Sequence, residues 1–187
     1  MSKKKLGVLI SGGGTNLQAI IDACESGQLN AEIVLIVSNA SKAYGLERGK
    51  KHGITTLISR NDEEIRDAFK EAGAELLVLA GYLRTVTPTL IEAYPNRIIN
   101  IHPSLIPAFS GKGYYGLKVH EGVIKRGVQI TGATTHIVND ALDEGRILKQ
   151  ECLRVHPDDT AETLQQRVLE IEHKILVETI EKMIGEI

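Results

Sequence analysis

The sequence predicts an α/β fold: a Rossmann-like, doubly wound, mostly parallel sheet with an antiparallel C-terminal strand pair and a long C-terminal helix. Three observations carry this prediction. Short apolar runs alternate with segments of helical periodicity through the first half of the chain, as in strands joined by crossover helices. Further on, two segments of alternating polarity are separated by a short acidic turn, which favours an antiparallel pair. The chain then closes with an apolar stripe at helical spacing.

Length and charge narrow the class of protein. A chain of 187 residues and 20.4 kDa can bury a full core, so we expect residues 1–187 to form a single domain. The formal net charge of −2 and the pI near 6.3 argue against nucleic acid as a partner. No apolar stretch is long enough to span a membrane, and the basic start lacks a signal-peptide cleavage pattern. We therefore expect a soluble, cytoplasmic protein, either a monomer or a homodimer.

The chain contains two cysteines, Cys24 and Cys152, which lie far apart and in no metal-ligand spacing. A reduced compartment suits such a pair, and both residues are expected to be buried as small apolar side chains. The sequence therefore predicts neither a disulfide nor a metal site.

The first half of the chain is predicted to alternate between strands and helices. A strand at 6–10 leads into a glycine-rich segment, residues 11–14, which we call the glycine loop. The helix that follows begins with Thr15-x-x-Gln18, which has the form of a capping box. The later elements are a strand at 33–37, helix 44–52, strand 54–58, helix 62–72, strand 76–79, helix 88–94 and a strand from 98. The segment 76–79 is entirely apolar, which indicates a central parallel strand.

The pattern changes in the second half. A loop rich in glycine and tyrosine at 109–116 precedes a predicted helix at 117–125. Strands are predicted at 129–138 and 147–155, joined by an acidic turn at 139–145. Asp158-Asp159-Thr160 is expected to open the last helix.

The glycine loop is a candidate anion site, because free amides and the helix dipole point towards such a loop. It is not a dinucleotide fingerprint, since Leu17 stands where the third glycine would fall, and the chain has no Gly-Lys-Ser/Thr of a Walker loop. A tight turn without a ligand is the alternative interpretation. We favour a single phosphate bound by the amides of Gly14, Thr15 and Asn16.

A second candidate site begins at Asn100-Ile101-His102-Pro103. Residues two apart share one side of a strand, so Asn100 and His102 can converge where the strand ends. An amide next to an imidazole that titrates near neutral pH suits acyl transfer. A lone histidine is more often structural, and we expect His136 to be one near the site. Either Asp140 or Asp143 could approach His102 and raise its pKa, although a solvated acidic turn is the alternative.

Three motifs together resemble the glycinamide ribonucleotide transformylase (phosphoribosylglycinamide formyltransferase) family, which uses folate. They are Ser11-Gly12-Gly13-Gly14-Thr15-Asn16-Leu17-Gln18, Asn100-x-His102-Pro103-Ser104-Leu105-Ile106-Pro107 and Asp143-x-Gly145. The similarity runs over nearly the whole chain. The His-Pro-Ser-Leu segment is shared with methionyl-tRNA formyltransferase and with enzymes that hydrolyse formyltetrahydrofolate. The glycine loop and Glu172-His173 in the last helix point to the glycinamide ribonucleotide enzymes.

The resemblance implies transfer of the formyl group of 10-formyltetrahydrofolate to the amine of 5'-phosphoribosylglycinamide in purine biosynthesis, without a metal. It implies a catalytic group in which Asn100 and protonated His102 stabilise the oxyanion and Asp143 keeps His102 charged. Gly14, Thr15 and Asn16 would bind the phosphate, and Glu172 the glycinamide or ribose. The residues implied to bind folate are Leu83, Arg84, Thr85, Val86, Asn100, Asp140 and Asp143.

One departure from the family pattern, one unassigned arginine and three rival interpretations remain. Arg146 stands where the family commonly has a proline. The family often has a folate-contacting arginine in the segment around Arg60, and we leave Arg60 without an assigned role. Methionyl-tRNA formyltransferases usually carry an additional basic C-terminal domain, and formyltetrahydrofolate hydrolases an N-terminal regulatory domain, whereas this sequence shows neither. A nucleotide-binding module without catalysis is the rival from another class.

Overall fold

The computed structural model describes residues 2–187, whose seven strands form one sheet in the order β3-β2-β1-β4-β5-β6-β7. The strands are β1 (Lys4–Ile10), β2 (Ala31–Ser38), β3 (Thr56–Ile58), β4 (Leu76–Leu79), β5 (Ile98–His102), β6 (Ile130–Ile137) and β7 (Ile147–Arg154). Pairings among β1 to β5 are parallel, whereas β6 runs antiparallel to both β5 and β7. The predicted fold class is confirmed, including the central position of β4.

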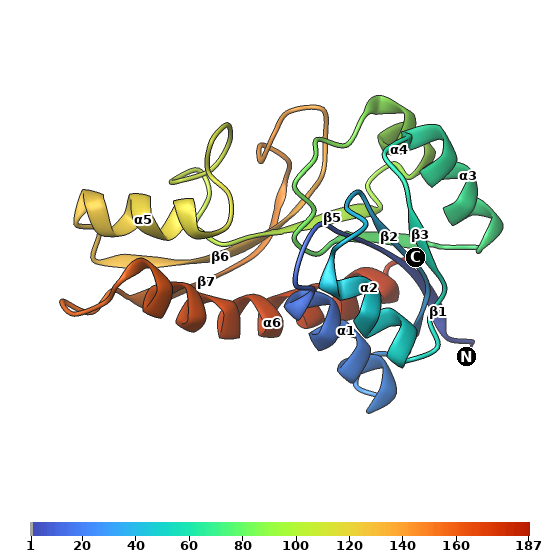
Figure 1. Ribbon diagram of the computed structural model, residues 1–187, viewed down its shortest axis with the longest axis horizontal. Helices are drawn as coiled ribbons and strands as arrows, with labels where there is room; N and C mark the ends of the chain where they lie inside the picture. The colour runs from blue at the N-terminus through green and yellow to red at the C-terminus, as the bar shows by residue number, and fades with distance from the viewer. Residues whose placement is uncertain (1) are drawn as a thin grey trace.

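Helices cover both faces of the sheet (Figure 1). They are α1 (Thr15–Glu25), α2 (Tyr44–Lys51), α3 (Asp62–Glu71), α4 (Pro88–Ala93), α5 (Leu117–Arg126) and α6 (Ala161–Gly185). Apolar side chains of α1, α2, α5 and α6 belong to one buried cluster, and those of α3 and α4 belong to a second. The sheet therefore has a hydrophobic core on each face, as its parallel strands require.

The packing of α3 shows how the sequence builds one of these cores. The side chain of Asn61 caps the helix by accepting a hydrogen bond from the amide of Glu63 at 2.9 Å. Phe69 is fully buried, and a Cβ on Gly7 of β1 would lie 2.5 Å from its ring. Gly7 thus lets Phe69 reach the sheet, where burying a ring of this size stabilises the fold by roughly 1.5–3 kcal/mol.

The strand order turns back at β1, which pairs with β2 on one side and with β4 on the other. In doubly wound sheets, ligands bind outside the carboxyl ends of the strands at such a switch point. The segments that leave this edge are the glycine loop after β1, residues 80–87 after β4 and residues 103–116 after β5. The topology therefore brings both predicted sites to one edge of the sheet.

Two expectations from the sequence are wrong. The helix after the glycine loop begins at Thr15 itself, and Gly14 is its N-cap residue, so no side chain caps it. Thr15 is already helical, which removes it from the capping position. Cys152 is exposed, whereas Cys24 is buried as predicted. Cys152 lies on β7, the edge strand, and half of the residues of β7 are exposed.

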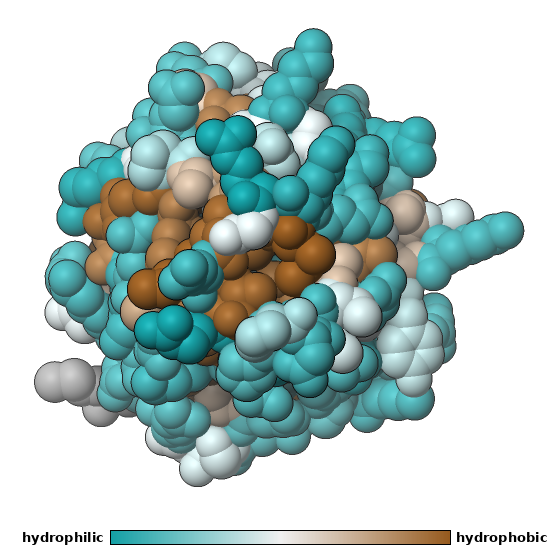
Figure 2. All heavy atoms as spheres, turned by 90° about the vertical axis from the view of Figure 1, so that its left-hand side faces the viewer, coloured by the Kyte–Doolittle hydropathy of each residue, from teal (hydrophilic) through white to brown (hydrophobic). Residues whose placement is uncertain are grey.

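Figure 2 shows the end of the molecule near α5, where polar atoms surround an apolar area. Ile130, at the start of β6, is 51% exposed. No helix within residues 2–187 is both long and apolar enough to cross a membrane.

Candidate active site

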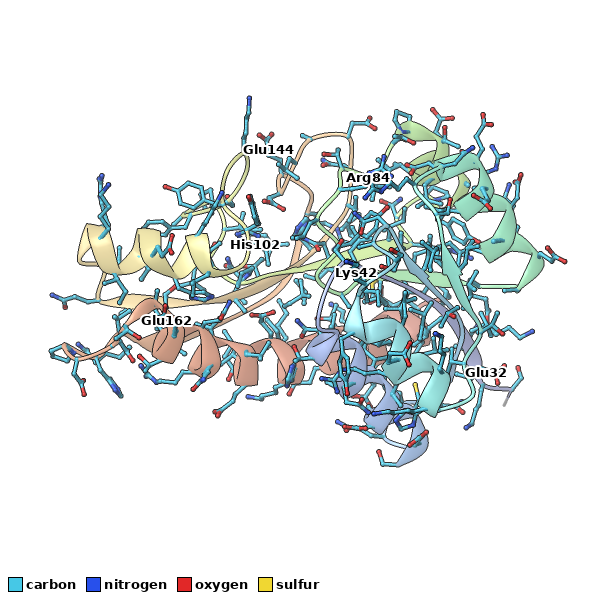
Figure 3. The ribbon with its side chains drawn as sticks, in the orientation of Figure 1. Glu32, Lys42, Arg84, His102, Glu144 and Glu162 are labelled. Atoms are coloured by element: carbon cyan, nitrogen blue, oxygen red, sulfur yellow. The ribbon has the colours of Figure 1, made fainter. Side chains whose placement is uncertain are left out.

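A cleft of about 740 Å³ lies along the carboxyl edge of the sheet. Gly13 and Thr15 line the end formed by the glycine loop, and Asn100, His102 and Asp143 line the cleft further on. Figure 3 shows His102 between α5 and the strands, with Arg84 further along the same edge. The two sites predicted from the sequence are therefore parts of one cleft.

Most of the predicted residues line this cleft, and a few do not. Leu83, Arg84, Thr85 and Val86 all line it, as does Glu172. Gly14 and Asn16 lie behind its surface, in the backbone of the loop and in the buried start of α1. Asp140 is exposed and does not line the cleft, whereas Asp143, three residues later, does.

The pairing of β5 with β6 places Asn100 opposite His136. Nδ1 of His136 lies 2.9 Å from the carbonyl oxygen of Ile137, and its Nε2 lies 3.0 Å from Nδ2 of Asn100. Because the carbonyl can only accept, Nδ1 carries a proton, and in the neutral ring Nε2 then accepts from the Asn100 amide. His136 is therefore a satisfied structural histidine near the site, as predicted, and it also fixes the orientation of Asn100.

His102 is 5% exposed and has a protein atom near each ring nitrogen. Its Nε2 donates to the carbonyl oxygen of Phe109 at 2.9 Å, and its Nδ1 lies 3.6 Å from Oδ2 of Asp143. Burial lowers the pKa of His102, while the Phe109 carbonyl and the Asp143 carboxylate oppose this effect. Burial is the largest of these effects, so the pKa of His102 stays below its ordinary value although two acceptors flank the ring.

Asp143 accepts a hydrogen bond from the backbone and not from His102. Its Oδ2 accepts from the amide of Gly111 at 2.9 Å, and the 3.6 Å to His102 is too long for a direct hydrogen bond. Its Oδ1 lies 3.7 Å from Nε2 of His136. Burial would raise the pKa of Asp143, but His136, the Gly111 amide and His102 together hold it below the ordinary value. Asp143 is therefore ionised, and it lies close to the rings of both His102 and His136.

One short segment, residues 109–111, contacts both His102 and Asp143. Phe109 has a left-handed backbone with φ of 51°, which is rare outside glycine. Its ring packs edge-on against Tyr114, with ring centres 5.7 Å apart. A Cβ on Gly122 of α5 would lie 3.0 Å from Tyr114 and 3.1 Å from Phe109. Gly122 thus lets both rings close on α5, and the ring of Phe109 anchors the carbonyl that His102 binds.

At the other end of the cleft, Glu172 of α6 is 7% exposed. Its Oε2 accepts a hydrogen bond from Nδ2 of Asn16 at 2.8 Å, which joins α6 to α1. Burial raises the pKa of Glu172 to about 7, and the Asn16 bond opposes this. A buried carboxyl of this kind is a good partner for a substrate hydroxyl, which can either donate or accept.

Arg84 and Arg60 are linked through hydrogen bonds to backbone carbonyls. Nη1 of Arg84 donates to the carbonyl oxygen of Arg60 at 2.7 Å, and Nε of Arg60 donates to the carbonyl of Asn39 at 2.8 Å. Arg84 lines the cleft, whereas Arg60 and Arg146 do not. Within residues 2–187, no group of three or more His, Cys, Asp or Glu side chains is placed to hold a metal ion.

Several residues of this cleft were not predicted from the sequence. His120 of α5 lines the cleft and is fully buried, and neither ring nitrogen has a partner among residues 2–187. Burial lowers the pKa of His120 to about 4, so its ring is neutral. Gln165, Gln166 and Leu169 of α6 also line the cleft. Their helical spacing, together with that of Glu172, is the one signal that could have grouped them.

Known proteins that resemble this chain are formyltransferases. Residues 4–180 match the model of the formyl transferase family. The chain is 42% identical over 188 residues to a chloroplastic phosphoribosylglycinamide formyltransferase of Arabidopsis thaliana, which covers 95% of the chain and 64% of that relative. It is 40% identical over 181 residues to phosphoribosylglycinamide formyltransferase of Haemophilus influenzae, covering 92% of the chain and 83% of the relative. It thus spans less than two thirds of the length of the Arabidopsis protein.

Two solved structures resemble this one over most of the length of both chains. Glycinamide ribonucleotide transformylase 1 from Symbiobacterium toebii superposes with a TM-score of 0.90 at 39% identity, covering 96% of this chain and 87% of that one. Phosphoribosylglycinamide formyltransferase from Bacillus halodurans gives 0.88 at 37% identity, covering 96% and 95%.

Proposed function

This chain belongs to the formyl transferase family, among its phosphoribosylglycinamide formyltransferases, and on that premise we propose that it transfers the formyl group of 10-formyltetrahydrofolate to the amine of 5'-phosphoribosylglycinamide. The observation that carries this proposal is a single cleft that has, at one end, loop amides without an acceptor among residues 2–187 and, further along it, Asn100, His102 and Asp143. Small-molecule substrates are the only partners that this reaction requires, and the proposal needs no metal.

The reaction needs alignment more than it needs a protein nucleophile. The primary amine attacks the formyl carbon directly once both substrates lie in the cleft, which converts a bimolecular step into an effectively unimolecular one. The proton leaves the attacking nitrogen, and the C–N bond to the folate breaks as the folate nitrogen takes up a proton, which releases tetrahydrofolate and the formylated product. The chain has to hold the substrates, stabilise the oxyanion and take up that proton.

Asn100 and His102 are the proposed donors to the oxyanion. One amide hydrogen of Asn100 is directed at His136, which leaves the second for the formyl oxygen. Nε2 of His102 already donates to the carbonyl of Phe109, so the formyl oxygen would compete with that carbonyl for the same proton. Donors of this kind act on charge that develops only after attack.

Asp143 is the proposed acceptor of the proton, directly or through a water molecule. Its pKa lies below the ordinary value, so it is ionised at neutral pH and free to accept. The same charge favours the protonated form of His102, whose Nδ1 lies 3.6 Å away. One carboxylate thus serves both the donor and the proton transfer.

The two substrates are proposed to enter from different sides. The ribonucleotide phosphate would bind the amides of the glycine loop, near Thr15, with Glu172 at the ribose. The pterin would lie against Leu83 to Val86, with the loop at 139–144 reading its edge. Because Leu83 is 60% exposed, binding of an aromatic ring there would bury apolar surface.

An assay with three acceptors tests the proposal. The purified chain is mixed with 10-formyltetrahydrofolate and with phosphoribosylglycinamide, methionyl-tRNA or buffer alone, and release of tetrahydrofolate is measured. We expect turnover that depends on phosphoribosylglycinamide and yields the formylated product. Equal release in buffer would identify a hydrolase, and formylation of methionyl-tRNA alone would identify the tRNA enzyme. No turnover with folate bound would favour a non-catalytic module.

A further inference from the structure

The glycine loop is held from behind by α2. The carbonyl of Gly12 accepts a hydrogen bond from the amide of Gly45 at 3.0 Å, and the carbonyl of Gly13 accepts one from Nε of Arg48 at 2.8 Å. Gly45 and Arg48 are three residues apart in α2 and so face the same side of it. A Cβ on Gly14 would lie 2.7 Å from the Cα of Gly45, so the loop and the helix touch through their backbones.

These two bonds determine where the amides of the loop point. In a trans peptide the carbonyl of one residue and the amide of the next are fixed in opposite directions. Because the carbonyls of Gly12 and Gly13 face α2, the amides of Gly13 and Gly14 face away from it. Neither amide has an acceptor within residues 2–187, and Gly13 lines the cleft. Contacts on the α2 side thus turn the donors towards the anion site.

The guanidinium of Arg48 is itself fixed on three sides. Besides Gly13, its Nη1 donates to Oε1 of Gln18 at 3.1 Å, and its Cζ lies 5.1 Å from the centre of the Tyr44 ring. The ring of Tyr44 is a favourable neighbour for a cation. Arg48 does not line the cleft, and residues 11–16 carry no cationic side chain of their own. Its charge therefore lies behind the loop and not in the cleft.

We propose that Arg48 is a positioning residue for the ribonucleotide phosphate: it holds the Gly13 carbonyl away from the cleft and supplies positive charge behind the glycine loop. This inference rests on the proposed function, in which a phosphate binds these amides. Arginine suits the task because its fork of donors reaches a carbonyl and an amide oxygen at once, which a lysine ammonium does not do with the same geometry.

The first test is the kinetics of Arg48→Met. Losing one charge-assisted hydrogen bond that orients the loop should raise the KM for phosphoribosylglycinamide about tenfold. The KM for 10-formyltetrahydrofolate and kcat should stay within about twofold, because neither depends on the loop. Arg48→Lys keeps the charge without the fork, so we expect a rise of about threefold. A general loss of structure would instead change all three parameters.

Lys50→Met is the matched control. Lys50 lies on the same helix and is exposed, and its ammonium pairs with Glu47 at 2.8 Å. The substitution removes the same charge without touching the loop, so it should leave the ribonucleotide KM unchanged. An equal rise in Lys50→Met would mean that net charge alone matters, and it would overturn the positioning role.

A titration with inorganic phosphate separates this inference from the proposed function. We expect the backbone amide resonances of residues 13–16 to shift in the wild type, with weaker binding in Arg48→Lys and weaker still in Arg48→Met. If the wild type binds phosphate there but does not formylate phosphoribosylglycinamide, the proposed reaction fails and the role of Arg48 stands. Unchanged phosphate binding in Arg48→Lys, or in Arg48→Met where that variant folds, overturns the role of Arg48.

Discussion

The two ends of the cleft present different chemical groups, backbone amides at one end and side chains at the other. At the phosphate end, the ligand is expected to meet backbone amides. The left-handed backbone that this loop requires is adopted by glycine, as in Gly14 with φ of 71°. At the catalytic end, the groups are side chains from three separate segments, and two non-glycine residues adopt left-handed conformations. These are Phe109 and Asp143, with φ of 51° and 57°.

This difference separates what local sequence determines from what tertiary packing determines. A glycine costs little in a left-handed turn, whereas Phe109 and Asp143 cost about 1–3 kcal/mol each and persist only because their surroundings hold them. The strain lies at the two residues that contact His102. The catalytic end is therefore expected to be sensitive to changes that leave the phosphate end intact.

The largest effect is expected from the two proposed oxyanion donors. Asn100→Ala and His102→Ala should each lower kcat by ~10²–10³, equivalent to about 2.7–4 kcal/mol, with both dissociation constants nearly unchanged. The double variant should lose less than the product of the two, because both donors serve one oxygen. Rates and binding titrations on the three variants measure this. A collapse of substrate affinity with preserved turnover would show that these residues only clamp the ligand.

The second effect concerns Glu172 at the phosphate end, whose carboxyl has a strongly raised pKa. Burial raises the pKa of Glu172 from 4.5 to about 7. The folded chain therefore keeps this proton where the unfolded chain has lost it, so the free energy of unfolding falls as pH rises from 4.5 to about 7. Glu172→Gln removes the penalty and keeps an acceptor for Asn16. We expect it to be more stable than the wild type at pH 8, by at most about 3 kcal/mol.

Denaturant unfolding at two pH values checks this prediction. The two proteins should be nearly equal at pH 4.5, where the carboxyl of the wild type is protonated in the folded state. The same variant should bind phosphoribosylglycinamide more weakly if Glu172 meets the ribose. A stability difference that does not change with pH would argue against a perturbed carboxyl.

A third, smaller effect tests whether Asp143, and not Asp140, is the carboxylate that acts on His102. If protonated His102 is the active form, activity falls as pH rises through the pKa of His102. Asp143→Asn removes the negative charge that favours protonated His102, so it should move this limb to lower pH by about one unit, a shift that by itself lowers kcat at pH 7 about tenfold. Asp140→Asn makes the same charge change at an exposed position outside the cleft and is the control. The reverse pattern would assign the role to Asp140.

Local patterns predicted much of this molecule. The order and type of the elements followed from hydrophobic periodicity, and Asn100 and His102 followed from the end of a strand. The contacts of Phe109 and Gly111 could not be predicted in this way, because they use backbone groups that every residue has. Periodicity placed Glu172 in the last helix, but its contact with Asn16 joins residues 156 positions apart, which no local pattern encodes. The capping box failed because Gly14 takes the N-cap position by its left-handed conformation.

The smallest predicted effect separates the backbone of Phe109 from its ring. Asparagine tolerates the left-handed region better than leucine does, whereas leucine preserves more apolar packing against α5. If the position of the Phe109 carbonyl controls His102, Phe109→Asn should keep more activity than Phe109→Leu. The expected difference in kcat is about fivefold, corresponding to a strain of about 1 kcal/mol.

The two variants should rank in the opposite order for stability. Phe109→Asn loses the partly buried ring without apolar replacement and should unfold at a lower denaturant concentration than Phe109→Leu. Phe109→Tyr keeps the edge-on contact with Tyr114 and should resemble the wild type in both measurements. A crossing of the two rankings can arise only if activity follows the backbone conformation and stability follows the packing. If activity instead tracks stability across Tyr, Leu and Asn, the ring acts through packing alone, and the strained carbonyl has no part in positioning His102.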